Sequence, residues 1–152
     1  MKYGKVDTKG LKELQKSLKH LEDPSQFAEA CARELAARLL AKVTKRTPVG
    51  QYPKGSGMMG GTLRRGWTGS KRSSASSYVD ALPITYTDGK YVIEIINPTE
   101  YASYVEFGHR TVNHEGWVRG QFMMTISEKE LQEIAPELLE KRIWEYLRMC
   151  FP

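Results

Sequence analysis

The chain has 152 residues, 40% of them hydrophobic, and a formal net charge of +5. This length can bury a modest core and predicts a single domain over residues 1–152. No apolar run approaches the roughly 18 residues that cross a bilayer, so we expect a soluble protein, made without secretion, that has no membrane partner. Cys31 and Cys150 match neither a metal-ligand spacing nor a disulfide framework, and we expect buried thiols.

The N-terminal third predicts two amphipathic helices. Leucines recur at steps of three and four residues at positions 11, 14, 18 and 21, which predicts a helix from about Thr8 to His20. Asp23 then has the context of an N-cap, with Pro24 at the first position of a second helix that continues to about Lys45. The second helix carries small residues on its apolar stripe, which suit close packing on a sheet.

A long glycine-rich loop is expected after the second helix, over residues 47–61. Its "GSGMMG" matches G-x-G-x-x-G but lacks the preceding strand and following helix of a dinucleotide site. Loops of this length in compact domains are usually functional or disordered, and we expect this one to be mobile in the isolated subunit and fixed by assembly. The positions assigned to this assembly loop are Pro48, Gly50, Tyr52, Lys54, Gly55, Gly57, Gly60 and Gly61.

Strand signals dominate the middle of the chain. We expect a strand from Thr62 to Trp67, and "PITYTDGKYVIEII" predicts a β-hairpin with Asp88-Gly89 as a type I′ turn. Asn97 has the context of an N-cap for a short helix.

The short helix should end at Gly108, and residues 109–120 should form a loop. A long C-terminal helix should run from about Gln121 to Met149, kinked or divided by Pro136. These elements predict an α+β fold in which a small antiparallel β-sheet packs against long N-terminal and C-terminal helices.

Charge is distributed unevenly along the chain. Residues 1–79 hold 16 basic and 6 acidic side chains, for a net +10, whereas residues 80–152 hold 7 and 12, for −5. The stretch 35–79 contains bases but no acidic residue between its ends. Such a block is typical of a nucleic-acid footprint, of a surface that meets the acidic half of a neighbouring copy, or of a solvated loop.

Side chains of metal-ligating type gather in the next segment: Glu106, His109, His114 and Glu115. They would suit zinc or non-haem iron. However, the two histidines are five residues apart in an expected loop and do not form the i, i+4 pair of a helical site. We therefore expect no metal, no cofactor and no enzymatic activity.

The order of several motifs resembles the tail-component family of tailed bacteriophages and prophages. These motifs are "RTPVG", "GGTLRRGW", a hairpin, "NPTEYASYVEFGHR" and "GWVRGQFMM". The ordered motifs run from Arg46 to about Thr125, and the flanking helices extend the resemblance over nearly the whole chain. The chain departs from shorter members by its inserted "QYPKGSGMM". Members are described as tail-completion, neck or head–tail joining proteins.

The resemblance implies a structural virion protein of the tail or neck, made in the host bacterial cytoplasm. It implies a ring, hexameric, that joins the tail terminator or tail tube to the head-connector or stopper protein, with a possible passing contact with phage DNA. In a ring each subunit offers two complementary faces. The residues assigned to this interface are Arg64, Arg65, Trp67, Glu100, Tyr101, Tyr104, Glu106, His109 and Arg110. The alternative is a nucleic-acid-binding module that uses residues 35–79.

Overall fold

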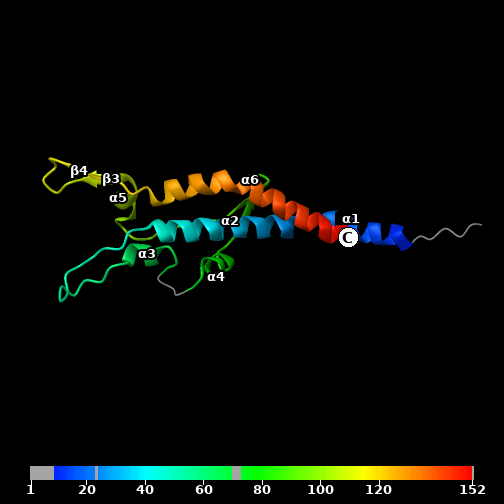
Figure 1. Ribbon diagram of the computed structural model, residues 1–152, viewed down its shortest axis with the longest axis horizontal. Coiled ribbons are helices and arrows are strands. Elements are labelled where there is room, and N and C mark those ends of the chain that lie inside the picture. The colour runs from blue at the N-terminus through cyan, green and yellow to red at the C-terminus, as the bar shows by residue number, and fades with distance from the viewer. Residues whose placement is uncertain (1–8, 23, 70–72, 152) are drawn as a thin grey trace, which may run out of the picture.

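Two long antiparallel helices, α2 (Ser25–Arg46) and α6 (Met123–Cys150), form the axis of an elongated molecule (Figure 1). The computed structural model describes residues 9–22, 24–69 and 73–151. Helix α1 (Lys9–Glu22) lies at one end of the axis. Helix α5 (Ala102–Phe107) and the strands β3 (Gly108–Arg110) and β4 (Trp117–Arg119) lie at the other end, together with residues 47–61.

The core lies where α2 meets the shorter helices α3 (Thr62–Gly66) and α4 (Ala75–Asp80) and the start of α6. Its buried members are Ala36, Leu40, Val43, Leu63, Trp67, Val79 and Met123. The principal neighbours of α2 are α6 and α4, and its contact with β2 is smaller, so the expectation of close packing on a sheet is wrong for most of the helix. Small side chains allow a close approach to helices as well as to a sheet, so the stripe alone did not identify the partner.

The strand expected over Thr62–Trp67 is also wrong, because this segment begins with helix α3. Leu63 and Trp67 are both only 5% exposed, and their spacing of four residues puts them on one face of a helix. Gly61, at φ +90°, provides the left-handed residue before the helix, and its carbonyl accepts from the Arg65 N–H at 2.9 Å. Burial of this pair decides the local conformation.

The predicted hairpin with the Asp-Gly turn is confirmed. β1 (Thr85–Thr87) pairs antiparallel with β2 (Lys90–Val92). Asp88 and Gly89 have φ of 52° and 74°, as a type I′ turn requires. The strands are shorter than the run of β-forming residues that predicted them. The fold is α+β, as expected. The described residues form two separate two-stranded sheets instead of the one small sheet that was predicted.

Asn97 does not cap the short helix. The helix is α5, and Tyr101 precedes its first residue. The Asn97 side chain instead accepts from the Thr99 N–H at 3.1 Å and donates to the Leu63 carbonyl at 2.7 Å, which ties this turn to α3. Gly108 ends the helix at φ +88°, as expected.

The loop expected over residues 109–120 contains a second hairpin. In it, β3 pairs antiparallel with β4, with Gly108 opposite Arg119 and Arg110 opposite Trp117. Thr111 and Gly116 close the turn, through Thr111 N to Gly116 O at 3.0 Å and Gly116 N to Thr111 Oγ1 at 2.9 Å. The strands have three residues each and no Asn-Gly or Asp-Gly turn, so the usual sequence signal for a hairpin is missing.

The two terminal helices largely follow the sequence prediction. α1 was expected from Thr8 to His20 and spans Lys9–Glu22, while the predicted N-cap at Asp23 lies outside the described residues. α6 continues through Pro136, so the predicted division is wrong, and Figure 1 shows that its axis bends along its length. In the part of the chain that the structure describes, no helix is both long and apolar enough to span a membrane.

Candidate interface for other subunits

Apolar side chains are exposed on three segments at the end of the molecule opposite α1 (Figure 1). We call this the end surface. Its members are Val49, Tyr52, Met58 and Met59 of the loop, Tyr101, Tyr104 and Phe107 at α5, and Val112, Trp117 and Val118 of the second hairpin. Soluble monomers rarely expose large apolar patches, and Tyr, Trp, Phe and Met are enriched in protein interfaces.

The segment "EYASYVEFGHR" contributes exposed aromatic and charged groups to the end surface. Tyr101 and Tyr104 are 44% and 59% exposed. The ring of Tyr104 lies 5.8 Å from that of His109, centroid to centroid, with the two planes tilted by 47°. Glu100 and Arg110 are also exposed, so this segment offers hydrogen-bonding groups beside its aromatic rings.

The loop and α5 share a cavity of about 230 Å³. It is lined by Pro48, Val49, Gly50, Tyr52, Met59, Gly61, Thr62, Leu63, Tyr101 and Val105. Tyr101, which was assigned to the interface, therefore meets Pro48, Gly50, Tyr52 and Gly61 of the predicted assembly loop at this cavity. The cavity is large enough for an apolar side chain presented by another protein.

Residues 47–61 contain no helix or strand and are exposed over most of their length, including Lys54. The two ends of the loop approach each other closely at Gly50 and Gly60. A Cβ atom on Gly60 would lie 2.0 Å from the Gly50 carbonyl oxygen, so only glycine fits there. Gly55 and Gly57 have positive φ, which glycine adopts without strain. Mobility of the loop in the free subunit stays a prediction.

Glu106 is buried and holds the beginning of α6. Its carboxylate accepts from the Met124 N–H at 2.9 Å, and from the Thr125 N–H and hydroxyl at 2.9 and 2.7 Å. The first N–H groups of a helix have no partner within the helix and lie at the positive end of its dipole. A carboxylate at this place accepts hydrogen bonds from those N–H groups, and its negative charge interacts favourably with the dipole. Phe122, which precedes the helix at φ 49°, supplies no such side-chain cap.

Arg64 and Trp67 hold the end of α2. The Arg64 guanidinium donates to the Thr47 carbonyl from Nε at 3.0 Å and from Nη2 at 2.6 Å. The Trp67 indole N–H donates to Thr47 Oγ1 at 2.7 Å, and that hydroxyl donates to the Val43 carbonyl at 2.6 Å. Arg65 is exposed, and its Nη1 donates to the Gly60 carbonyl at 3.1 Å. Three residues assigned to the interface, Arg64, Trp67 and Glu106, thus have contacts inside their own subunit.

The metal-ligating side chains do not converge. Glu106 is committed to α6, whereas His109, His114 and Glu115 are exposed on the second hairpin. Among residues 9–22, 24–69 and 73–151, no group of three or more His, Cys, Asp or Glu side chains is placed to hold a metal ion. Absence of a metal from the protein stays a prediction, to be checked by elemental analysis.

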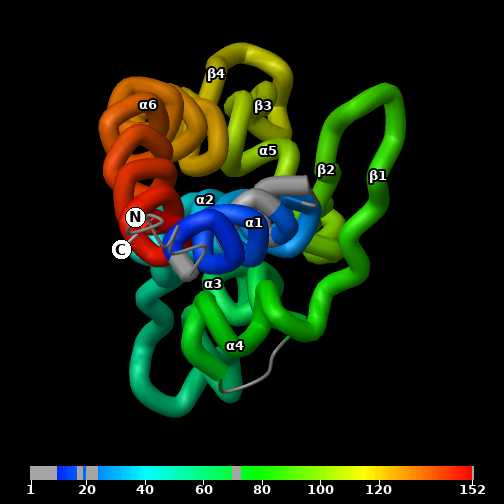
Figure 2. Tube along the Cα trace, turned by 90° about the vertical axis from the view of Figure 1, so that its right-hand side faces the viewer, coloured from blue at the N-terminus to red at the C-terminus, as the bar shows by residue number. Residues whose placement is uncertain are grey.

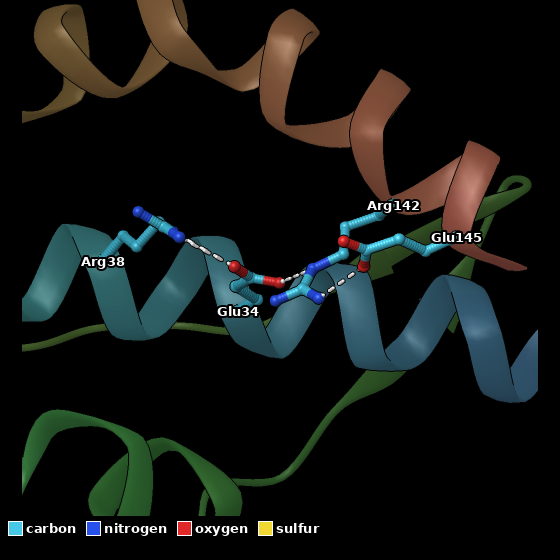
Figure 3. Close-up of polar contacts among 4 residues, drawn as sticks. All are labelled: Glu34, Arg38, Arg142 and Glu145. Carbon is cyan, nitrogen blue, oxygen red and sulfur yellow. Dashed lines mark hydrogen bonds and ion pairs between the residues drawn. The ribbon is translucent and has the colours of Figure 1, made fainter.

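Ion pairs link α2 to α6, and sequence reasoning missed them. Figure 3 shows Glu34 between Arg38, at 2.9 Å, and Arg142, at 2.7 Å, with Glu145 also on Arg142 at 2.8 Å. The hydrogen bond from Arg142 is the largest effect and lowers the pKa of the Glu34 carboxyl below its ordinary value. Burial opposes this shift, and the hydrogen bond from Arg38 adds to it. Glu34 and Arg142 are 108 residues apart in the sequence, so no local pattern reveals this pair.

A second cluster joins the same two helices farther along. Glu130 accepts from Lys42 at 3.0 Å and from Arg46. Hydrogen bonds from Lys42 and then Arg46 lower the pKa of the Glu130 carboxyl. Of the free thiols, Cys150 is buried as expected, while Cys31 is only partly buried.

One family of known proteins matches the chain. Residues 12–108, more than half of the sequence, match the family described as "Bacteriophage HK97-gp10, putative tail-component". No curated protein and no solved structure matches. The match spans α2, the loop, α3, the first hairpin and α5, which include the elements that form most of the end surface. The chain belongs to the HK97-gp10-like tail-component family of bacteriophages, and it is a tail component.

Proposed function

We propose that this protein is a structural subunit of a ring of six copies at the neck or top of the tail. The ring completes the tail and joins the tail terminator or tail tube to the head-connector or stopper protein. The role is one of assembly and not of catalysis. Membership of a phage tail-component family supports a place in the virion and contacts with other virion proteins.

The observation that carries the proposal is the end surface. Val112 is 99% exposed, Met59 77% and Trp117 63%, and all lie at one end of the molecule. Leaving such side chains in water is unfavourable by about 25 cal/mol for each Å² of apolar surface, so an occupant that covers them would gain that free energy. A tail partner that seats on this end is such an occupant.

The end surface has two sides, as a ring requires. Figure 2, which views the molecule from the α1 end, shows the second hairpin and residues 47–61 on opposite sides of α2. A subunit in a closed ring makes a heterologous contact, in which different patches of two neighbours meet. The hairpin of one copy and the loop cavity of the next are candidates for this contact, with Tyr101, Tyr104, Glu100, His109, Arg110 and Arg65 around it.

The proposal is tested with charged substitutions on the end surface. Phe107→Asp combined with Val112→Asp should leave the helical circular dichroism unchanged, because both side chains are exposed. It should prevent assembly of the purified protein in mass photometry and abolish complementation of tails made without the protein. Met149→Asp is the matched control, since Met149 is 80% exposed near the C-terminal end of α6. Full joining activity of the double variant would contradict the proposal.

A further inference from the structure

The side chains of helix α1 that the structure describes are exposed, and two of them are large and apolar. Leu11 and Leu14 are 64% and 45% exposed. Figure 1 shows α1 projecting beyond the end of α2, where it contacts the end of α6. Isolated helices of this length are only marginally stable in water, because most helical stability comes from packing. A partner outside the chain would stabilise α1.

Three exposed lysines form a row on α1. Lys12, Lys16 and Lys19 follow each other at steps of four and three residues, which places them on one face of the helix. None forms an ion pair with a residue that the structure describes. At 100° per residue, Leu14 lies about 140–160° from each lysine and Leu11 about 80–140°, so the lysines make a polar face separate from these two leucines.

A row of glutamates with the same spacing lies on α6. Glu133, Glu137 and Glu140 are exposed and follow each other at steps of four and three residues. Within the described part of the chain they too have no ion-pair partner. Like charges at these spacings repel each other within one helix, and on α6 Lys129 and Lys141, each four residues from a member of the row, offset part of this repulsion. A row of opposite charge would relieve the rest.

The two rows cannot meet within one chain as it is folded. The contact of Lys42 with Glu130 sets the glutamate row beside the C-terminal half of α2. α1 joins the opposite end of α2 and points away from it (Figure 1). From Cys150, at the end of α6 near α1, back to Glu133 is about 25 Å at 1.5 Å per residue.

We propose that the lysine row of α1 docks on the glutamate row of α6 in the next copy of this chain. The inference rests on the proposed ring and names its second contact: α1 is an arm that crosses each subunit boundary. Equal spacing allows three charge pairs to form together when the helices lie alongside. Because these charges are exposed, the contact weakens as salt screens it.

Two charge-reversed chains test the contact. One carries Lys12→Glu, Lys16→Glu and Lys19→Glu, and the other carries Glu133→Lys, Glu137→Lys and Glu140→Lys. Each should stay monomeric in mass photometry at a concentration where the wild-type chain assembles. Mixed together, they should recover assembly, with equal numbers of the two chains and an even total, because each arm then meets a row of opposite charge only in the other variant.

The control reverses exposed charges elsewhere, at Lys90→Glu and Glu94→Lys, and should assemble like wild type. Wild-type assembly by the lysine-reversed chain would overturn the inference, and loss of assembly in Leu11→Ser would then assign the contact to the other side of α1. Failure of the mixture to assemble, or a monomeric wild-type chain, would also overturn it. Failure of the proposed function is a different result: assembly follows the charges, yet tails lacking the protein are joined to heads equally well.

Discussion

Removing the carboxylate of Glu106 should destabilise the fold by loosening the start of α6. The side chain is 7% exposed and accepts three hydrogen bonds of 2.7–2.9 Å from Met124 and Thr125. Loss of a helix cap costs about 0.5–2 kcal/mol, and the N–H of the partly buried Met124 adds up to about 1–3 kcal/mol when it loses its acceptor, whereas water can reach the exposed Thr125. These contributions overlap, so we expect Glu106→Ala to lower the free energy of unfolding by about 3 kcal/mol.

Thermal unfolding followed by circular dichroism measures this effect. For a chain of this size about 1 kcal/mol corresponds to roughly 2–4 °C, so Tm should fall by roughly 6–12 °C. Glu106→Gln keeps an acceptor but loses the charge, and its Tm should lie between those of wild type and the alanine variant. Glu100→Ala is the control, because that side chain is exposed. A Tm for Glu106→Ala within about 1 °C of wild type would refute the capping role.

Three further predictions concern Arg64, the loop over residues 47–61 and the ion pair between α2 and α6. Arg64→Ala should lower the unfolding free energy by about 1–3 kcal/mol because it releases the carbonyl at the end of α2, whereas Arg65→Ala should change it by less than about 0.5 kcal/mol; equal Tm values would contradict this. Trypsin should cut after Lys54 faster in the free subunit than in the assembled protein, and equal rates would count against ordering of the loop by assembly. Arg142 lowers the pKa of Glu34 in the folded protein, so the stabilisation is present above the ordinary glutamate pKa of about 4.3 and is lost as the pH falls through the folded value. Glu34→Gln should therefore flatten the fall of Tm between about pH 5 and pH 3, and an unchanged acid profile would argue against the pair.

Local chemistry explains which elements could be predicted from the sequence. Asp88-Gly89 is a turn that requires positive φ at two successive positions, and Gly108 ends α5 for a related reason. Such requirements act over a few residues, so they are visible in the chain itself. The periodic leucines of α1 and the stripe of α2 are visible for the same reason.

The elements that were predicted wrongly depend on distant contacts. Leu63 and Trp67 adopt a helical conformation because both are buried against α2, although Thr62 and Trp67 themselves are residue types that favour strands. The second hairpin has short strands and a turn closed by Thr111, a device without a strong sequence signature. The function of Glu106 depends on backbone groups 18 and 19 residues away, so the sequence showed a carboxylate among aromatics but not what it binds.

In the folded chain, carboxylates from other segments lie beside several of the basic side chains of the acid-free stretch 35–79. Arg38 pairs with Glu34 and Lys42 pairs with Glu130, so carboxylates from outside the stretch neutralise part of it. Arg64 is directed to a carbonyl of its own chain. Exposed cations such as Lys45 remain, and residues 70–72 lie outside the described part of the chain. A nucleic-acid site here would have to break these ion pairs or use few cations. Affinity for oligonucleotides should therefore be weak, and it should fall with salt by the small slope that a few phosphate contacts give.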